Sequence, residues 1–252
     1  LKIIHTDVVV AHDDNPLFAL KSKKQSSTHI CATLVANKQA DAVVSCANTG
    51  ALLAIGRFII KRRTGVDKLA LVAAFPTYNR GESYLCDVGA NVEATPSDLH
   101  RQAIMASDMF KRAHSDEAPR VALLNVGTES SKGNILANET STLLRNDPDI
   151  NFCGSVEGHN IFKGDADVVI CDGFVGNCVL KSCEGTANFI MSTIKQACMT
   201  STLTKLFGGA LRSILKSQAP RLNPSLRNGA LVLGLNGIVI KSHGHADTLG
   251  IE

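Results

Sequence analysis

Short runs of apolar residues alternate along the chain with longer stretches in which apolar residues recur at helical spacing. This alternation is typical of an α/β protein whose mostly parallel sheet is covered by helices. The last two runs flank Asn236-Gly237, a dipeptide that favours a tight hairpin turn between antiparallel strands. The predicted strands are residues 2–5, 42–45, 69–74, 84–86, 121–124, 168–171, 231–235 and 238–241.

Helices are predicted between these strands. The apolar residues of the stretch 52–60 fit a largely buried helix, and Thr95-Pro96-Ser97-Asp98 predicts a capped helix start with proline in the first turn. We find no linker or low-complexity tract, so residues 1–252 predict a single α/β domain. The abrupt first strand at 2–5 and the abrupt end at 250–252 suggest that N-terminal strand–loop–helix units and the extreme C-terminus are missing.

Composition narrows the possible functions. The 252 residues are 44% hydrophobic, enough for a sizeable core, and 26 Lys+Arg against 23 Asp+Glu give a formal charge of only +3. Nucleic-acid binders concentrate basic charge and stacking aromatic residues, whereas this chain has no Trp and 4% aromatic residues. The weakly positive balance suits an acidic protein partner or an anionic substrate.

Eight cysteines occur without a Cys-x-x-Cys pair, and several lie inside apolar runs. This pattern predicts reduced, buried thiols that act as small hydrophobic residues. Zinc sites and disulfide frameworks show tighter spacing. The chain also shows neither a signal peptide nor an apolar run long enough to span a bilayer, and these features together predict a cytoplasmic protein.

Four predicted strands lead directly into loops rich in Gly, Asn and Asp, at residues 46–50, 87–91, 125–134 and 172–177. Ligands of open parallel sheets bind beyond the carboxyl ends of the strands, where glycine permits close approach and helix N-termini offer free N–H groups to anions. We therefore expect the four loops to share one edge and to form an anion site, although plain turns have the same composition. None of them has the spacing of a nucleotide-binding loop.

Cationic residues accompany these loops. Lys132 lies within the third loop, Lys181 follows the fourth by one helical turn, and Lys241 and His243 follow the final strand. Each lysine is a candidate for anion contact or a solvated surface charge. His243 is a candidate phosphate ligand, proton donor or bystander.

At these residues the chain resembles the PlsX-type phosphate acyltransferases. Two departures from that family are visible: Ala47 replaces the usual Gly, and Thr128 and Ser130 replace the usual Glu. The family's N-terminal Asp-Ala-Met-Gly-Gly-Asp motif is also absent. The matching motifs, in order, are Asn48-Thr49-Gly50-Ala51, Asp87-Val88-Gly89-Ala90-Asn91, Lys132-Gly133-Asn134, Val156-Glu157-Gly158, Asp172-Gly173-Phe174-Val175-Gly176-Asn177, Ser182-Cys183-Glu184-Gly185 and Lys241-Ser242-His243-Gly244.

The resemblance implies a three-layer α/β sandwich related to isocitrate/isopropylmalate dehydrogenases and phosphotransacetylases. It also implies a homodimer that moves a fatty acyl group from acyl carrier protein to inorganic phosphate, with no cofactor. The acyl phosphate product feeds phospholipid synthesis. Two alternatives remain open: a phosphotransacetylase that uses coenzyme A, and a non-catalytic binding protein.

The hypothesis for the reaction places phosphate on residues 48–50 and 132–134, with Lys181 assisting. Backbone donors of residues 172–177 stabilise the oxyanion, and Lys241 or His243 stabilises or protonates the leaving sulfur. No metal and no cysteine nucleophile is proposed. The predicted catalytic residues are Lys181, Lys241 and His243; the predicted phosphate- or substrate-binding residues are Asn48, Thr49, Gly50, Asp87, Asn91, Lys132, Gly133, Asn134, Asp172, Gly173 and Asn177.

Residues 185–228 predict a helical hairpin. Within it, residues 201–216 mix apolar side chains with three basic ones around Gly208-Gly209. Two interpretations fit this pattern: an apolar dimer interface, or a tip that contacts anionic membrane reversibly.

Overall fold

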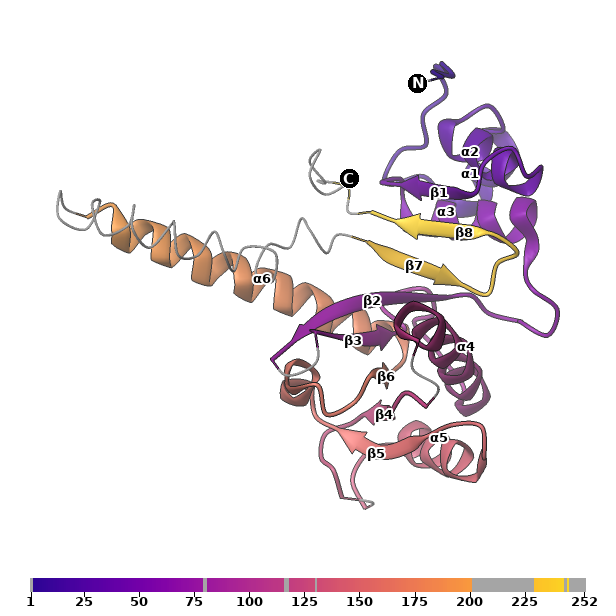
Figure 1. The fold of residues 1–252 in the computed structure, drawn as a ribbon. Helices are drawn as coiled ribbons and strands as arrows, with labels where there is room; N and C mark the ends of the chain where they lie inside the picture. Colours follow the sequence, from indigo (N-terminus) through magenta and orange to yellow (C-terminus); the bar gives the residue numbers. More distant parts are fainter. Residues whose placement is uncertain are drawn as a thin grey trace.

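In the described part of the chain, eight strands form one mixed sheet with helices on both faces (Figure 1). The computed structural model describes residues 2–78, 81–115, 118–129, 131–200, 229–242 and 244. The strands, in their order across the sheet, are β1 (Ala42–Ser45), β8 (Ile238–Lys241), β7 (Ala230–Leu233), β2 (Ala70–Thr77), β3 (Gly81–Cys86), β6 (Val168–Ile170), β4 (Val121–Leu124) and β5 (Phe152–Val156).

The helices differ in length and type. Two short ones are not α-helical: η1 is a π-helix and η2 a 3₁₀-helix. The helical elements are α1 (Pro16–Ser22), α2 (Ser27–Ala36), α3 (Thr49–Ile55), η1 (Gly56–Lys61), α4 (Pro96–His114), α5 (Ile135–Asn146), η2 (Gly158–Lys163) and α6 (Gly173–Cys198).

Hydrophobic cores on the two faces of the sheet make it the middle of three layers. Along β3, Leu85 joins one core while Tyr84 and Cys86 join the other, as the alternation of side chains along a strand requires. Helices α2, α3, η1 and α6 contribute to the first core, and α4 and α5 to the second. The predicted α/β sandwich is confirmed.

Strand direction divides the sheet. The pairings β1–β8, β3–β6, β4–β6 and β4–β5 are parallel, so parallel pairings outnumber antiparallel ones among the described strands. The pairings β7–β8, β2–β7 and β2–β3 are antiparallel. As a result, β1 and β8 run opposite to β3, β6, β4 and β5, which decides where their loops lie.

Local sequence signals fix several helix starts. Thr95 caps α4 in a full capping box with Asp98, and Pro96 occupies the first turn, as predicted. Asp172 caps α6 by accepting a hydrogen bond from the N–H of Val175. The predicted hairpin around Asn236-Gly237 is present, since β7 and β8 pair antiparallel.

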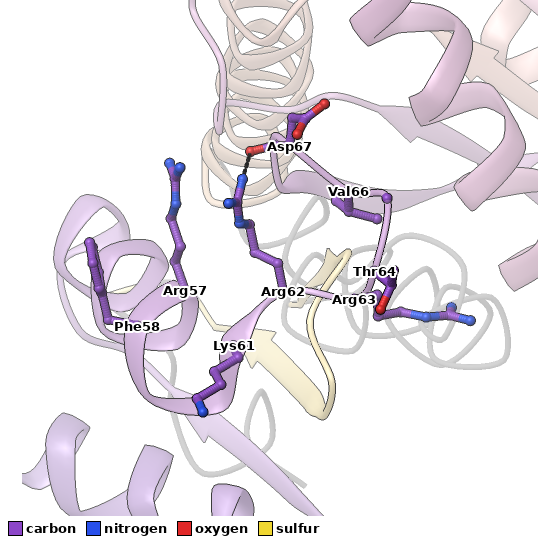
Figure 2. Close-up of a pocket in the computed structure, with 9 residues that line it drawn as sticks. Arg57, Phe58, Lys61, Arg62, Arg63, Thr64, Val66 and Asp67 are labelled. Atoms are coloured by element: carbon purple, nitrogen blue, oxygen red, sulfur yellow. Dashed lines mark hydrogen bonds between the residues drawn. The ribbon is translucent and has the colours of Figure 1, made fainter.

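Two local predictions are wrong, and one strand was not predicted. Residues 2–5 form no strand, because Ile3 is 87% exposed and no neighbouring strand pairs with the segment in the described structure. Strand β5 was not predicted, since Gly154, which has a positive φ, and Ser155 interrupt the apolar residues of Phe152–Val156. Within the stretch 52–60, Phe58 is 59% exposed on the outside of η1 (Figure 2), whereas Ile60 is buried.

The cysteines are all unpaired, as expected, but not all are buried. Cys86 and Cys171 lie in the core, where burial raises the pKa of each thiol well above its usual range. Cys153 and Cys178 are exposed. The prediction of buried thiols therefore holds only for some positions.

Helix α6 projects away from the sheet (Figure 1). Only Gly173 and Gly176 are buried along it, and Phe189 is 70% exposed. The first part of the predicted 185–228 hairpin continues this helix as far as Cys198. Residues 201–228, with the predicted membrane or dimer tip, and His243 lie outside the described residues. In the described part, no helix has the length and apolar character needed to cross a membrane.

Candidate functional site

The loop after β3 is organised by the carboxylate of Asp87, which is fully buried. One oxygen accepts hydrogen bonds from the N–H groups of Leu71, Gly89 and Ala90, at 3.1, 3.1 and 2.9 Å. The other accepts from the backbone and side-chain nitrogens of Asn91, both at 2.8 Å. Burial raises the pKa of Asp87, and these hydrogen bonds oppose the rise. Asp87 therefore shapes the loop.

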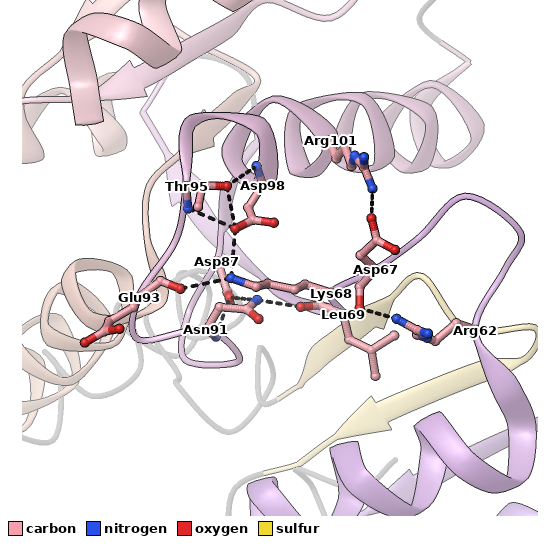
Figure 3. Close-up of polar contacts among 10 residues, drawn as sticks. All are labelled: Arg62, Asp67, Lys68, Leu69, Asp87, Asn91, Glu93, Thr95, Asp98 and Arg101. Carbon is pink, nitrogen blue, oxygen red and sulfur yellow. Dashed lines mark hydrogen bonds and ion pairs between the residues drawn. The ribbon is translucent and has the colours of Figure 1, made fainter. Parts of the chain in front are cut away.

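Asn91 ties this loop to the segment before β2. Its side-chain nitrogen donates to the carbonyl of Leu69 at 2.6 Å (Figure 3). Its own carbonyl accepts the N–H of Gly173 at 2.8 Å. Two predicted site residues, Asp87 and Asn91, thus hold the start of α6 against the end of β3.

The first turn of α6 packs directly on this loop, which requires glycine at two positions. A Cβ at Gly173 would lie 2.6 Å from the carbonyl oxygen of Asn91, and one at Gly176 would lie 1.9 Å from that of Asp87. Asn177 lies beside Gly89, where an added Cβ would be 3.6 Å from its side chain. The structure therefore brings together the 87–91 and 172–177 loops.

Backbone donors at the start of α6 are partly occupied. The N–H of Gly173 is bonded to Asn91, and that of Val175 donates to the Asp172 side chain at 2.9 Å. The side chain of Asn177 is exposed one turn further along. The side-chain amide of Asn177 is therefore a better candidate donor to an oxyanion than the backbone N–H groups of Gly173 and Val175.

A second group of predicted residues gathers around Lys241. This lysine pairs with Ser45 in the β1–β8 register, and Ser242 N donates to Ser45 O at 2.9 Å. Burial lowers the pKa of Lys241, the nearby Cys46 opposes this shift, and the charge of Lys181 adds to it. Lys181 also forms an ion pair with Glu184 at 2.8 Å. Lys181 and Lys241, far apart in sequence, are thus brought together.

The 48–50 loop lies at the same end of the sheet as Lys241. Asn48 caps α3 by accepting a hydrogen bond from Ala51 N at 3.0 Å, and its amide nitrogen donates to the carbonyl of His12. Gly50 is confined by Pro16, since an added Cβ would lie 2.8 Å from that ring. The contact with His12 was not predicted, because nothing in the local sequence links residues so far apart.

The 132–134 loop is built around Asn125. Its side-chain nitrogen donates to the carbonyl of Lys132 at 3.2 Å, and Gly133 has a φ of +100° with no room for a Cβ beside Asn125. Asn134 caps α5 by accepting from Ala137 N at 2.8 Å. The Lys132 side chain is exposed at the loop surface.

The prediction that all four loops share one edge is wrong for the first of them. Strands β3, β6 and β4 are parallel, so the 87–91, 172–177 and 125–134 loops lie at one edge. Strand β1 runs the opposite way, which places the 46–50 loop and Lys241 at the other edge. Helix α6 connects the two groups, because it begins at the first edge and carries Lys181 toward Lys241.

The chain is similar in fold to solved phosphotransacylases. It matches a phosphotransacetylase from Staphylococcus aureus with a TM-score of 0.56 and 15% identity, covering 89% of this chain and 64% of that one. It matches a branched-chain phosphotransacylase from Enterococcus faecalis with a TM-score of 0.53 and 18% identity, covering 87% and 72%. The fold is therefore that of the phosphotransacylase class.

Sequence comparison is more specific. The model of the family described as fatty acid synthesis protein matches residues 1–252. Phosphate acyltransferases from Herminiimonas arsenicoxydans and Coxiella burnetii are 44% and 47% identical, covering 100% and 98% of this chain and 71% and 72% of theirs. One from Latilactobacillus sakei is 45% identical over 98% of this chain and 74% of its own. The chain belongs to the phosphate acyltransferase family, and the resemblance to the PlsX type is confirmed.

Proposed function

We propose that the protein transfers a fatty acyl group from acyl carrier protein to inorganic phosphate and releases acyl phosphate for phospholipid synthesis. Family membership supports the transfer to phosphate. The observation that carries the proposal is the position of Lys241, which pairs with Ser45 just before the 48–50 loop and lies within reach of the charge of Lys181. Lys181 and the half-buried Lys241 come from distant parts of the sequence, and together these two cations are suited to binding an anion.

Phosphate supplies the nucleophile in this mechanism. It binds between Lys181, Lys241 and the side chains of Asn48 and Thr49. The two lysines neutralise its charge, and the uncharged side chains fix its orientation. One phosphate oxygen attacks the thioester carbonyl carbon, so that a C–O bond forms and the carbonyl oxygen becomes an oxyanion. Collapse of this intermediate breaks the C–S bond, and the sulfur leaves as a thiolate that takes up a proton.

Stabilisation of the oxyanion is assigned to Asn177. Residues four apart on a helix lie nearly above one another, about 6 Å along the axis, so the Asn177 amide lies about one turn from Lys181 on the same face of α6. The loop built by Asp87 and Asn91 holds this turn in place through its contacts with Gly173 and Gly176. Asp172 contributes as the cap of the helix.

Lys241 is proposed to stabilise or protonate the leaving sulfur. A lysine whose pKa is lowered by burial releases its proton more readily than an exposed one. His243, two residues further on, is the alternative proton donor. The 132–134 loop lies at the opposite edge of the sheet from the 48–50 loop, so this phosphate position does not include it, and its exposed Lys132 is a candidate for a separate anion contact.

The protein is proposed to act as a homodimer in the cytoplasm, with peripheral contact to anionic membrane. The unpaired state of all eight cysteines supports a reducing compartment. The exposed apolar residues of α6, including Phe189 and Ile190, support a further packing partner for that helix.

An assay for phosphate-dependent acyl phosphate formation tests the proposed function. The full-length gene product and residues 1–252 are each incubated with acyl-acyl carrier protein and phosphate, and the product is trapped with hydroxylamine as a hydroxamate. We expect hydroxamate only when phosphate is present. A strong preference for acyl-coenzyme A over the carrier protein favours the phosphotransacetylase alternative, and no transfer from either donor indicates a binding protein.

A further inference from the structure

A basic surface surrounds the end of η1, outside the site described above. Arg57, Lys61, Arg62 and Arg63 line a cavity of about 560 Å³ (Figure 2). Asp67 is the single acidic residue of the lining, and its carboxylate is paired with Arg101 from α4. The surface therefore carries a clear excess of positive charge. We call Arg57, Lys61, Arg62 and Arg63 the basic rim.

Three cations of the rim are available to a partner. Arg57, Lys61 and Arg63 are exposed, and in the part of the chain that the structure describes none of these side chains forms an ion pair. They point in different directions (Figure 2). A small anion is held by groups that converge on one point, whereas diverging cations match a broad acidic surface.

An exposed aromatic ring accompanies these charges. Phe58 is 59% exposed and lies next to Arg57 on the same short helix. Protein interfaces are enriched in aromatic residues and arginine, with charged groups at their edges. The combination of Phe58 and the basic rim thus fits a protein partner better than a free ion.

The backbone of the rim is clamped to the β7–β8 turn. The N–H of Arg63 donates to Gly234 O at 2.8 Å, and Asn236 donates to the carbonyls of Lys61 and Arg62, each at 3.0 Å. Lys61 has a φ of +69°, an uncommon conformation for a residue other than glycine. Together with the π-helical η1, this is the kind of irregular but well-anchored segment often found at functional sites.

Polar contacts connect the basic rim to the 87–91 loop, against which the first turn of α6 packs. The guanidinium of Arg62 donates to the carbonyl of Asp67, and Lys68 Nζ lies 2.8 Å from Asp98 and 3.3 Å from Glu93 O. The next residue, Leu69, accepts the hydrogen bond from Asn91 (Figure 3). A partner bound at the rim therefore lies beside the loop that positions Asn177.

We infer that the basic rim docks the acidic surface of the protein that carries the acyl donor, in a way that directs its thioester toward the start of α6. Within the proposed function, on which this inference rests, that partner is acyl carrier protein. Charge complementarity supplies the recognition, and it speeds encounter with an acidic partner by about 10- to 1,000-fold at low salt.

The test reverses charge at two rim positions in the full-length protein, with Arg57→Glu and Arg63→Glu combined. We expect the KM for acyl-acyl carrier protein to rise about tenfold or more, because like charges then face each other across the contact. Added salt should slow the wild type more than the variant. The kcat/KM for an uncharged acyl-pantetheine thioester and the KM for phosphate should stay unchanged.

Arg145→Glu is a charge-reversal control away from the rim, since Arg145 is an exposed arginine of α5 whose side chain donates to Ser141 at 3.5 Å. An unchanged KM in the double variant, or an equal rise in the control, overturns the docking surface. If the wild type does not use the carrier-protein donor, the proposed function fails. Calorimetry with acyl carrier protein then decides the docking separately: binding lost in the double variant upholds it, and no binding by the wild type refutes it.

Discussion

Replacing Gly176 with alanine places a methyl group where the carbonyl oxygen of Asp87 already lies. The ideal Cβ position is 1.9 Å from that oxygen and 2.9 Å from Cys171 Sγ, whereas real Cβ contacts essentially never fall below 3.0 Å. Either the first turn of α6 or the 87–91 loop must therefore move by about 1 Å. The loop cannot yield freely, since the carboxylate of Asp87 accepts hydrogen bonds from four different residues.

The expected loss of stability follows from two opposing effects. Overpacking of a closely packed site costs about 1–3 kcal/mol and occasionally more. Alanine regains about 1 kcal/mol over glycine inside a helix. Because the Gly176 clash is with backbone rather than with a flexible side chain, we expect the upper end of the first range and a net loss of about 2 kcal/mol.

The same substitution elsewhere in α6 provides the control. Gly185 lies in the same helix, is exposed, and has no heavy atom within 4 Å of an added Cβ. Gly185→Ala should therefore raise the free energy of unfolding by up to about 1 kcal/mol. Urea titration followed by circular dichroism compares the two variants with the wild type.

Activity should separate the variants further. A displacement of about 1 Å at Asn177 and Lys181 costs about 100-fold in turnover, because the reacting groups lose their alignment. Gly185→Ala should retain wild-type acyl phosphate formation. If Gly176→Ala is as stable and as active as Gly185→Ala, α6 does not rest on the Asp87 loop, and the assignment of Asn177 loses its basis.

Three further changes test individual residues. Burial lowers the pKa of Lys241, so activity that needs the protonated lysine should decline at a pH below the usual lysine pKa of 10.5. Lys241→Arg, which stays protonated, should move that decline to higher pH. An unchanged pH–rate profile would exclude Lys241 as the titrating group. Lys132→Ala should leave both the KM for phosphate and urea unfolding nearly unchanged, because the side chain is exposed and lies at the opposite edge of the sheet from the 48–50 loop. A raised phosphate KM would place the phosphate at the 132–134 loop instead. Asp87→Asn should lower the free energy of unfolding by about 1–3 kcal/mol, because the NH2 group of an amide cannot accept the hydrogen bonds that one carboxylate oxygen accepts. A variant with wild-type stability would contradict the assigned role of Asp87.

Much of the fold could be predicted because its signals are local. Runs such as residues 121–124 are apolar and bounded by turn residues, and β4 has these limits. Thr95 with Asp98 fixes the start of α4 through contacts only three residues apart. Strand β5 escaped prediction because Phe152–Val156 lacks an apolar pattern and exists through pairing with β4.

The residues of the candidate site were partly visible in the sequence, but their grouping was not. Gly, Asn and Asp after a strand mark a loop, and this signal found residues 87–91 and 172–177. The same signal could not tell that Asp87 is fully buried and occupied by the loop's own N–H groups. It also could not show that Phe58 is exposed beside the basic rim, because Phe58 and Ile60 are both apolar and only packing decides which of them is exposed.

The sequence by itself determined most of the elements, the caps of α4 and α6 and the family, because these depend on residue type and near neighbours. Only the tertiary structure decided the direction of β1 and β8 relative to β3, since the pairings β2–β7 and β1–β8 join residues far apart in the chain. That direction separates the 48–50 loop from the 87–91 loop and leaves α6 to connect them. The proximity of Lys181 to Lys241 also arises from this arrangement. Burial is the main cause of the lowered pKa of Lys241, and the charge of Lys181 adds to it because charge interactions depend on distance in space rather than in sequence.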